Sequence, residues 1–113
     1  MIQRYPGSVD TRSRMVVHDG RIFTVATSTK KPASLYEQTR EALAIIDAVL
    51  AEVGSSKSKI LSATVFITDM NRKREMNQAW DEWVDRLNAP QRACIGAALE
   101  GDDLVEILIT AAV

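Results

Sequence analysis

The chain has 113 residues, of which 46% are hydrophobic and 26% are charged, and its net charge is -1. This length and composition predict one globular domain spanning residues 1–113. The near balance of 14 basic and 15 acidic residues argues against a nucleic-acid or membrane partner, and no apolar run approaches the roughly 20 residues that cross a bilayer.

Disulfide and metal chemistry have few candidate residues. The chain holds one cysteine, Cys94, and one histidine, His18. A single thiol cannot form an internal disulfide, which suits a reducing compartment, and one Cys with one His is too few for a structural zinc site. The first ten residues lack the apolar core of a signal peptide. We therefore expect a cytoplasmic protein without a metal, and an exposed His18.

The first third of the chain is predicted to be β-structure. Residues 1–5 fit a short edge strand before the Pro6-Gly7 turn. Residues 14–19 and 21–27 are β-prone runs on either side of Asp19-Gly20. An Asp-Gly pair in this setting predicts a tight hairpin, because type I′ turns need positive φ angles.

A helix is predicted to follow. Ser34 and Glu37 have the spacing of a capping box, and Gly54 is a suitable residue to end the helix. Between them runs an apolar stripe with helical spacing. The stripe consists of Leu43, Ile46, Val49, Leu50 and Val53.

The second half of the chain alternates strand and helix before two final strands. Residues 60–67 predict a strand, and Asp69 or Asn71 can cap a second helix that ends before Pro90. The apolar stripe of that helix is Met76, Trp80, Trp83, Val84 and Leu87. Strands over 91–99 and 104–113 are expected on either side of a turn at 100–103. The order β-β-β-α-β-α-β-β predicts an α+β fold with both helices on one face of the sheet.

The final strands predict a second subunit. Val105, Ile107, Ile109 and Ala111 alternate onto one face, yet the opposite face of the same strand is also mostly small or apolar. We expect Arg92, Cys94 and Gly96 to lie on that second face. A sheet face without helices is ordinarily polar, and the chain has no third layer to cover it. Another copy of the chain is the economical cover.

Arg92 and Glu106 are the residues whose setting most suggests chemistry. A half-buried arginine needs an anionic partner, which is either an internal carboxylate such as Glu106 or the carboxylate of a ligand. Glu106 stands in an otherwise apolar strand, so it either pairs with an arginine or acts as a functional acid or base. Cys94 alone is more typical of a small core residue than of a nucleophile.

Three helical side chains have less decisive settings. Trp80 and Trp83 fit packing better than a base-stacking platform, and Asn77 faces either a cleft or solvent. No Gly-rich phosphate loop, nucleophile elbow or metal-ligand cluster occurs in the sequence.

Several segments, taken together in this order and spacing, resemble the Rid (reactive intermediate/imine deaminase) family from about Ser13 to Val113. The stretch 79–85 is closest to the YoaB-like subgroup. The matching segments are 17–23, 37–40, 45–54, Thr64-Val65-Phe66-Ile67-Thr68-Asp69-Met70, Met76-Asn77-Gln78-Ala79-Trp80, Pro90-Gln91-Arg92-Ala93-Cys94 and Leu104-Val105-Glu106-Ile107.

The resemblance implies a chorismate-mutase-like fold of the bacillus type and a homotrimer with clefts between subunits. Members of the RidA type hydrolyse 2-imino acids, formed from 2-aminoacrylate and related enamines, to 2-keto acids and ammonia without a metal or organic cofactor. By this resemblance Arg92 grips the substrate carboxylate and Glu106 orients the attacking water. Cys94 and Asn77 match residues at the cleft.

Two departures from the RidA pattern fall in the expected cleft. Ser13 stands where RidA-type proteins have a tyrosine, and Val25-Ala26-Thr27 stands where they have Ser-Gly-Gln. Together with the matched positions, these give the expected substrate-binding residues, which are Arg92, Cys94, Ser13, Asn77 and Ala26.

Two other functions are compatible with the same scaffold. A non-catalytic protein that binds small anions or another partner would keep Arg92 as an anion anchor and lose turnover through the changes at Ser13, Ala26 and Thr27. An endoribonuclease or translation inhibitor is less favoured, because the net charge is -1, aromatic residues are only 5% and the chain has no histidine pair.

Overall fold

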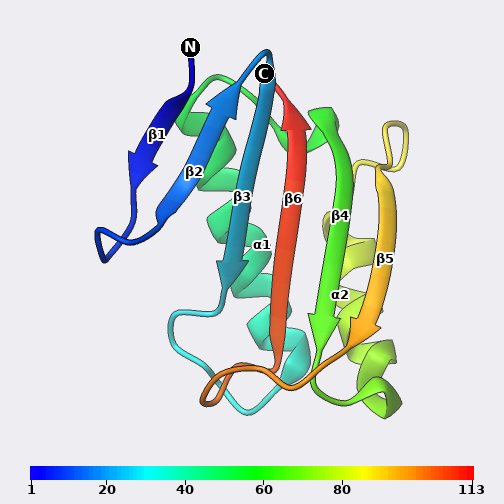
Figure 1. Ribbon diagram of the computed structural model, residues 1–113. Coiled ribbons are helices and arrows are strands. Elements are labelled where there is room, and N and C mark those ends of the chain that lie inside the picture. Colours follow the sequence, from blue (N-terminus) through cyan, green and yellow to red (C-terminus); the bar gives the residue numbers. More distant parts are fainter.

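A six-stranded sheet with two helices packed on it makes up the protein (Figure 1). The computed structural model describes residues 1–113. The strands are β1 Gln3–Pro6, β2 Ser13–His18, β3 Arg21–Thr27, β4 Ile60–Ile67, β5 Gln91–Gly96 and β6 Val105–Ala112. The helices are α1 Leu35–Glu52 and α2 Lys73–Trp83, with short 3₁₀ turns at Lys57–Lys59 and Met70–Arg72.

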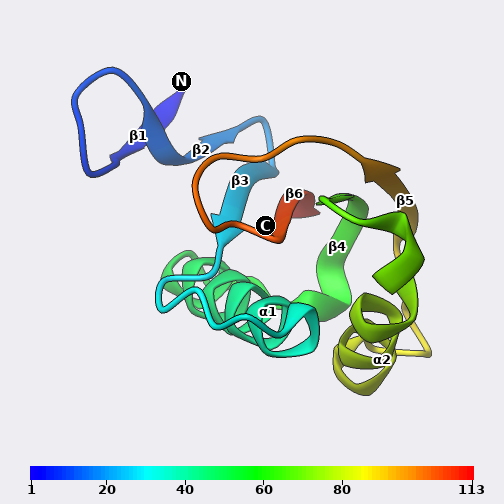
Figure 2. The same cartoon turned by 90° about the horizontal axis from the view of Figure 1, so that it is seen from below.

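The strand order is β1-β2-β3-β6-β4-β5, so the last strand in sequence lies in the middle of the sheet. All neighbouring pairs are antiparallel except β4 with β5, which are parallel. Figure 2 shows both helices on the same side of the sheet, as the sequence predicts. The other side has no covering layer within the chain, and we call it the open face.

The core lies between the helices and the sheet. Alternate residues of β6 point into it, among them Val105, Ile107 and Ile109, and they meet Leu43 and Ile46 of α1. Polar contacts also join the two helices, because the Trp83 indole N–H donates to Asp47 over 2.9 Å and the Tyr36 hydroxyl donates to Glu82. The prediction that the tryptophans serve packing agrees with this arrangement.

The structure confirms the hairpin turn and the helix ends that the first half of the sequence predicts. Asp19 and Gly20 have φ angles of 55° and 76° at the β2–β3 turn, as a type I′ hairpin requires. The Ser34 side chain accepts a hydrogen bond of 3.1 Å from the Glu37 backbone N–H and caps α1. Gly54, with φ 74°, follows the helix in the left-handed conformation that favours glycine.

Helix α2 is shorter than its apolar stripe predicts. Asp69 caps the 3₁₀ turn before it, and the helix ends at Trp83, so Val84 and Leu87 fall outside it. The Asp85 carboxylate accepts hydrogen bonds from the Leu87 backbone, from Asn88 and from the Ser58 hydroxyl. These bonds lower the pKa of Asp85 and give the chain an alternative to another helical turn. Leu87 is consequently 93% exposed.

The position of β5 differs from expectation. Instead of forming a hairpin with β6, β5 pairs in parallel with β4 at the edge of the sheet. Its register sets Arg92 beside Ala63 and Cys94 beside Val65, both of which are buried under the helices. Gly96 follows in the same register beside the buried Ile67. The prediction that Arg92, Cys94 and Gly96 lie on the face opposite the helices is therefore wrong.

The reason is that alternation shows which residues share a face, but not which face meets the helices. Ala93 and Ile95 are the more apolar pair, yet they point to the open face because that face is itself apolar. Four large apolar side chains that are between 40% and 46% exposed lie on it: Phe23, Val25, Ile95 and Leu108. The predicted apolar character of the second face is thus observed. Neither helix is long and apolar enough to cross a membrane.

Candidate functional site

Arg92 is held at the sheet edge by neutral groups. One guanidinium nitrogen donates to the Asn77 side-chain oxygen over 2.8 Å, and another lies 3.7 Å from the Met76 sulfur. The guanidinium carbon lies 5.3 Å from the centre of the Trp80 ring, a cation–π distance. The ion pairs of the structure involve other cations, so Arg92 is half-buried without a carboxylate partner.

Cys94 lies two residues further along β5 on the same side of the sheet, half-buried against the core. The strand ends at Gly96, where a Cβ atom would lie 2.9 Å from the Met70 Cγ. Arg92, Cys94, Asn77 and Trp80 therefore form one cluster between β5 and α2, which we call the arginine edge. Of the residues predicted from the sequence, Arg92, Cys94 and Asn77 are brought together here.

Glu106 belongs to a different part of the molecule. It is half-buried near the start of β6 and pairs with Thr27 on one side and Phe66 on the other. Its side chain points to the open face, because the neighbouring residues Val105 and Ile107 point into the core.

Arg92 and Glu106 do not pair within the chain. Glu106 is level with Phe66 and hence with Ile95, three residues beyond Arg92 and two strands away. Strand spacings put the two backbones about 14 Å apart, and the side chains lie on opposite faces. The alternative in which Glu106 is the internal partner of Arg92 is therefore wrong.

The remaining predicted residues lie at the same end of the sheet as Glu106. Ser13 begins β2, and Ala26 and Thr27 end β3. Thr27 shares the open face with Glu106, whereas the Ala26 methyl group is 5% exposed and points into the core beside Ile107. We call Ser13, Ala26, Thr27 and Glu106 the glutamate end. Ser13 lies four strands from β5, roughly 19 Å by strand spacing.

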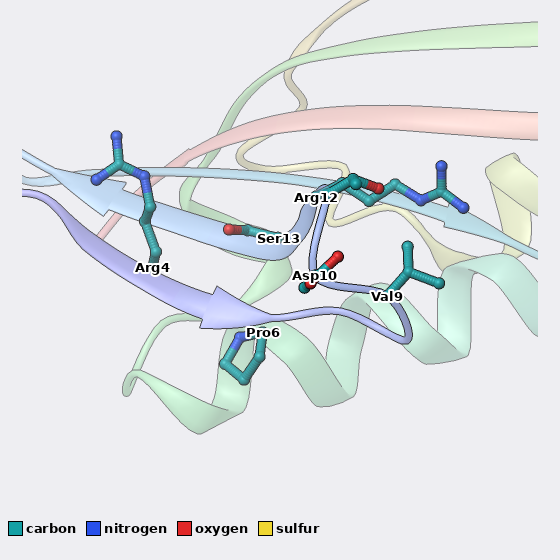
Figure 3. A pocket seen from close by; sticks show the side chains of 7 residues that line it. Arg4, Pro6, Val9, Asp10, Arg12 and Ser13 are labelled. Atoms are coloured by element: carbon teal, nitrogen blue, oxygen red, sulfur yellow. The ribbon is translucent and has the colours of Figure 1, made fainter.

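A hollow of about 480 Å³ lies beside Ser13, in the β1–β2 loop. Figure 3 shows Ser13 between Arg4 and Arg12, whose guanidinium groups point away from one another, with Asp10 close to the loop. Because the two cations do not converge, this hollow alone does not form an anion site.

Sequence reasoning missed Gln38, which orders the glutamate end. Its side chain is 1% exposed and donates to the carbonyl oxygens of Pro32 and Asp102, over 2.8 and 3.0 Å. Its side-chain oxygen accepts from the Leu104 backbone N–H over 2.9 Å, two residues before Glu106. The signal available in the sequence was a polar residue, Gln38, at helical spacing from the apolar residues Leu35 and Ala42. The Trp80 contact with Arg92 was also missed, because it depends on the position of β5.

Two ion pairs outside both regions lower the pKa of a carboxyl group. Arg14 donates two hydrogen bonds to Glu52, of 2.6 and 2.9 Å, and these lower the pKa of that carboxyl group. Arg72 likewise lowers the pKa of Glu75 at the start of α2. No cluster of three or more His, Cys, Asp or Glu side chains suited to a metal ion occurs.

Comparison with known proteins assigns the family. The arrangement is an α+β sheet with two helices on one face, in the chorismate-mutase-like manner. The family model described as "Endoribonuclease L-PSP" matches residues 1–113. The solved structure of NMB1025, a YjgF family member from Neisseria meningitidis, has a TM-score of 0.93 and 37% identity, covering 99% of this chain and 94% of that one.

Two sequence relatives refine the assignment. The RutC family protein YoaB of Escherichia coli (strain K12) is 43% identical over 102 residues, which is 89% of this chain and 90% of that protein. A protein of the same strain named "Putative reactive intermediate deaminase TdcF" is 32% identical over 105 residues, or 85% of this chain and 81% of that protein. The chain belongs to the Rid (YjgF/endoribonuclease L-PSP) family and is YoaB-like.

Proposed function

We propose that this protein hydrolyses 2-imino acids, such as 2-iminopropanoate formed from 2-aminoacrylate, to 2-keto acids and ammonia. The observation that carries the proposal is the Arg92 guanidinium, half-buried and without a carboxylate partner. A desolvated cation in this state favours an anion from outside the chain. The relative named as a reactive intermediate deaminase supports this class of substrate.

Arg92 binds the substrate carboxylate in this proposal. An arginine has five N–H donors, and two contacts, to Asn77 and Met76, leave three of them free. Two free donors suffice for a bidentate bond with a planar carboxylate, which a lysine ammonium group reproduces poorly. Cys94 and Asn77 line the same edge and limit the size of the group beside the carboxylate.

Glu106 activates water in the proposed reaction. It accepts a proton from a water molecule whose oxygen adds to C2 of the imine, and it then gives this proton to the imine nitrogen. In the resulting carbinolamine, Glu106 takes the hydroxyl proton and gives it to the amino nitrogen. Ammonia leaves as the C2–N bond breaks and the C2–O double bond forms, and Glu106 is a carboxylate again. Imines are already electrophilic, so orientation and a single general base are enough. The reaction needs no metal or organic cofactor.

The arginine edge and the glutamate end act together only across two subunits. Within one chain they lie on opposite faces of the sheet, so we propose a homotrimer in which the arginine edge of one subunit meets the glutamate end of the next. The apolar side chains of the open face, including Val25 and Leu108, supply the surface that would be buried. Ser13 and Thr27, which shares the open face with Glu106, then help to shape the cleft from the second subunit, whereas the buried Ala26 points into the core and does not reach it.

Replacement of Arg92 tests the proposal. Arg92→Ala should lower kcat/KM for 2-iminopropanoate by about 30-fold to several thousand-fold, because losing a desolvated charge partner costs roughly 2–5 kcal/mol. The trimer should persist, and Arg92→Lys should restore little activity. Keto acid release and oligomer mass are measured on the same purified samples. A trimeric Arg92→Ala protein with wild-type turnover would contradict the proposal.

A non-catalytic anion-binding protein is the main competing function. One observation favours this alternative. Ser13, Ala26 and Thr27 are neutral residues, so they add no second acid or base to Glu106 at the glutamate end. Wild-type protein that binds pyruvate through Arg92 without turning over 2-iminopropanoate would establish it. The family is also described as an endoribonuclease family, and RNA cleavage that survives Arg92→Ala would favour that activity instead.

A further inference from the structure

The neutral groups around Arg92 constrain its guanidinium group to different degrees. The Asn77 oxygen accepts from one nitrogen of the guanidinium, and it defines one point in its plane. The Met76 sulfur is a weak acceptor at 3.7 Å. Neither contact prevents the planar group from rotating about the line that joins it to Asn77.

Trp80 supplies the missing constraint. Trp80 is 6% exposed and packs in the hydrophobic core, and its ring centre lies 5.4 Å from that of Trp83. The guanidinium carbon lies 5.3 Å from the Trp80 ring centre. A buried ring face attracts the cation through its quadrupole and favours one position of the guanidinium.

From this arrangement we infer that Trp80 is a positioning and specificity-determining residue that acts through Arg92. It presents the free N–H groups in one orientation, so that planar carboxylates bind in preference to anions of other shapes. This inference rests on the proposed role of Arg92 as the carboxylate anchor. Trp80 touches neither the imine nor the water in the proposed reaction.

A positioning role predicts a particular kinetic pattern. The substrate carboxylate is not altered during hydrolysis, so the contribution of Trp80 is equal in the ground state and the transition state. Loss of such uniform binding raises KM and leaves kcat unchanged. Trp80→Leu should therefore raise KM for 2-iminopropanoate and the Kd for pyruvate by about 5- to 30-fold. Trp80→Tyr keeps an aromatic face and should remain within about threefold of wild type.

Trp83 provides the matched control. It lies on the same helix and contacts Trp80, but its ring is stacked with Lys57 at 5.4 Å and its N–H donates to Asp47. Trp83→Leu removes a partly buried aromatic ring from the same helix and leaves the ring beside Arg92 in place. It should lower the thermal midpoint while leaving KM and the pyruvate Kd within about twofold, since no cation–π contact with Arg92 is lost.

A spectroscopic measurement does not require the Leu variant to fold. Because the chain has two tryptophans, Trp83→Phe leaves Trp80 as the sole indole emitter. Pyruvate that binds Arg92 should change Trp80 emission saturably, with a midpoint equal to the Kd from calorimetry. The change should be absent in the double variant with Arg92→Met.

The outcomes separate this inference from the proposed function. Pyruvate binding weakened by Trp80→Leu, restored by Trp80→Tyr and unaffected by Trp83→Leu supports the inference even if wild-type protein shows no imine turnover. Wild-type imine turnover combined with unchanged KM and Kd in Trp80→Leu would overturn the inference and leave the proposed function standing. Calorimetric binding of pyruvate without any response of Trp80 emission would also overturn it.

Discussion

The arginine edge and the glutamate end hold their charged groups in different ways. At the arginine edge, Arg92 is fixed by side chains of a neighbouring helix, namely Asn77 and Trp80. At the glutamate end, Glu106 is fixed by backbone, since it sits in a central strand whose start is secured by Gln38. The position of the Arg92 guanidinium therefore depends on the packing of α2, and the position of the Glu106 carboxylate depends on the register of the sheet.

This difference shows why one chain holds only parts of the proposed site. A side chain on an edge strand is available to a neighbouring molecule, whereas Glu106 on the open face is reached only by something that covers that face. A contact between two unlike surfaces of the same chain generates a ring when the rotation closes. The separation of the two groups thus favours a cyclic assembly over an isolated subunit.

The largest expected effect comes from the glutamate end. Glu106→Gln should lower kcat by about 10²- to 10⁴-fold, the usual range for a general base, with little change in pyruvate affinity. Glu100→Gln, in the exposed loop before β6, is the matched control and should behave as wild type. Steady-state kinetics with calorimetry of pyruvate binding would check both. Loss of pyruvate affinity with intact kcat would assign Glu106 to binding instead.

A charge on the open face should separate the subunits. Leu108 lies at the centre of that face and is 40% exposed, whereas Leu87 lies after α2 and is 93% exposed. Leu108→Asp should dissociate the protein to 12.5 kDa chains at micromolar concentration, because an unpaired carboxylate would be buried in the interface. Leu87→Asp should not alter the mass. Sedimentation that gave the same mass for Leu108→Asp as for wild type would place the interface elsewhere.

The smallest expected effect concerns the Arg14–Glu52 ion pair, which lies outside the arginine edge and the glutamate end. Arg14 lowers the pKa of Glu52 below its ordinary value of 4.5, so the pair stabilises the fold above that value and the contribution is lost as pH falls through the lowered pKa. Both side chains are well exposed, so the contribution should be small. Glu52→Gln should lower the thermal midpoint slightly at neutral pH and not at all in strong acid. Activity should be unchanged at neutral pH.

Local signals in the sequence were sufficient for much of the fold. The Asp19-Gly20 turn, the Ser34 cap and the apolar alternation of β6 each depend on neighbouring residues, and each is observed. The end of α2 was not predictable in this way. It depends on Ser58, which is distant in sequence and joins the hydrogen bonds of Asp85.

The candidate site was predictable as residues but not as an arrangement. Arg92 was predicted from its sequence setting, and Cys94 and Asn77 from the family resemblance, and the three lie together. Their side of the sheet was assigned wrongly, because it follows from the parallel pairing of β5 with β4 across 23 intervening residues. Strand order is a non-local property, and the alternation of side chains does not encode it.

Complementation between two inactive variants tests the central claim most directly. Arg92→Ala and Glu106→Gln proteins are each assayed alone, then unfolded, mixed in equal amounts and refolded together. If each site takes Arg92 from one subunit and Glu106 from the next, every mixed trimer regains one intact site, and about a quarter of wild-type activity should return from random assembly. Mixed trimers, verified by mass, that stay as inactive as either variant alone would contradict a site shared between subunits.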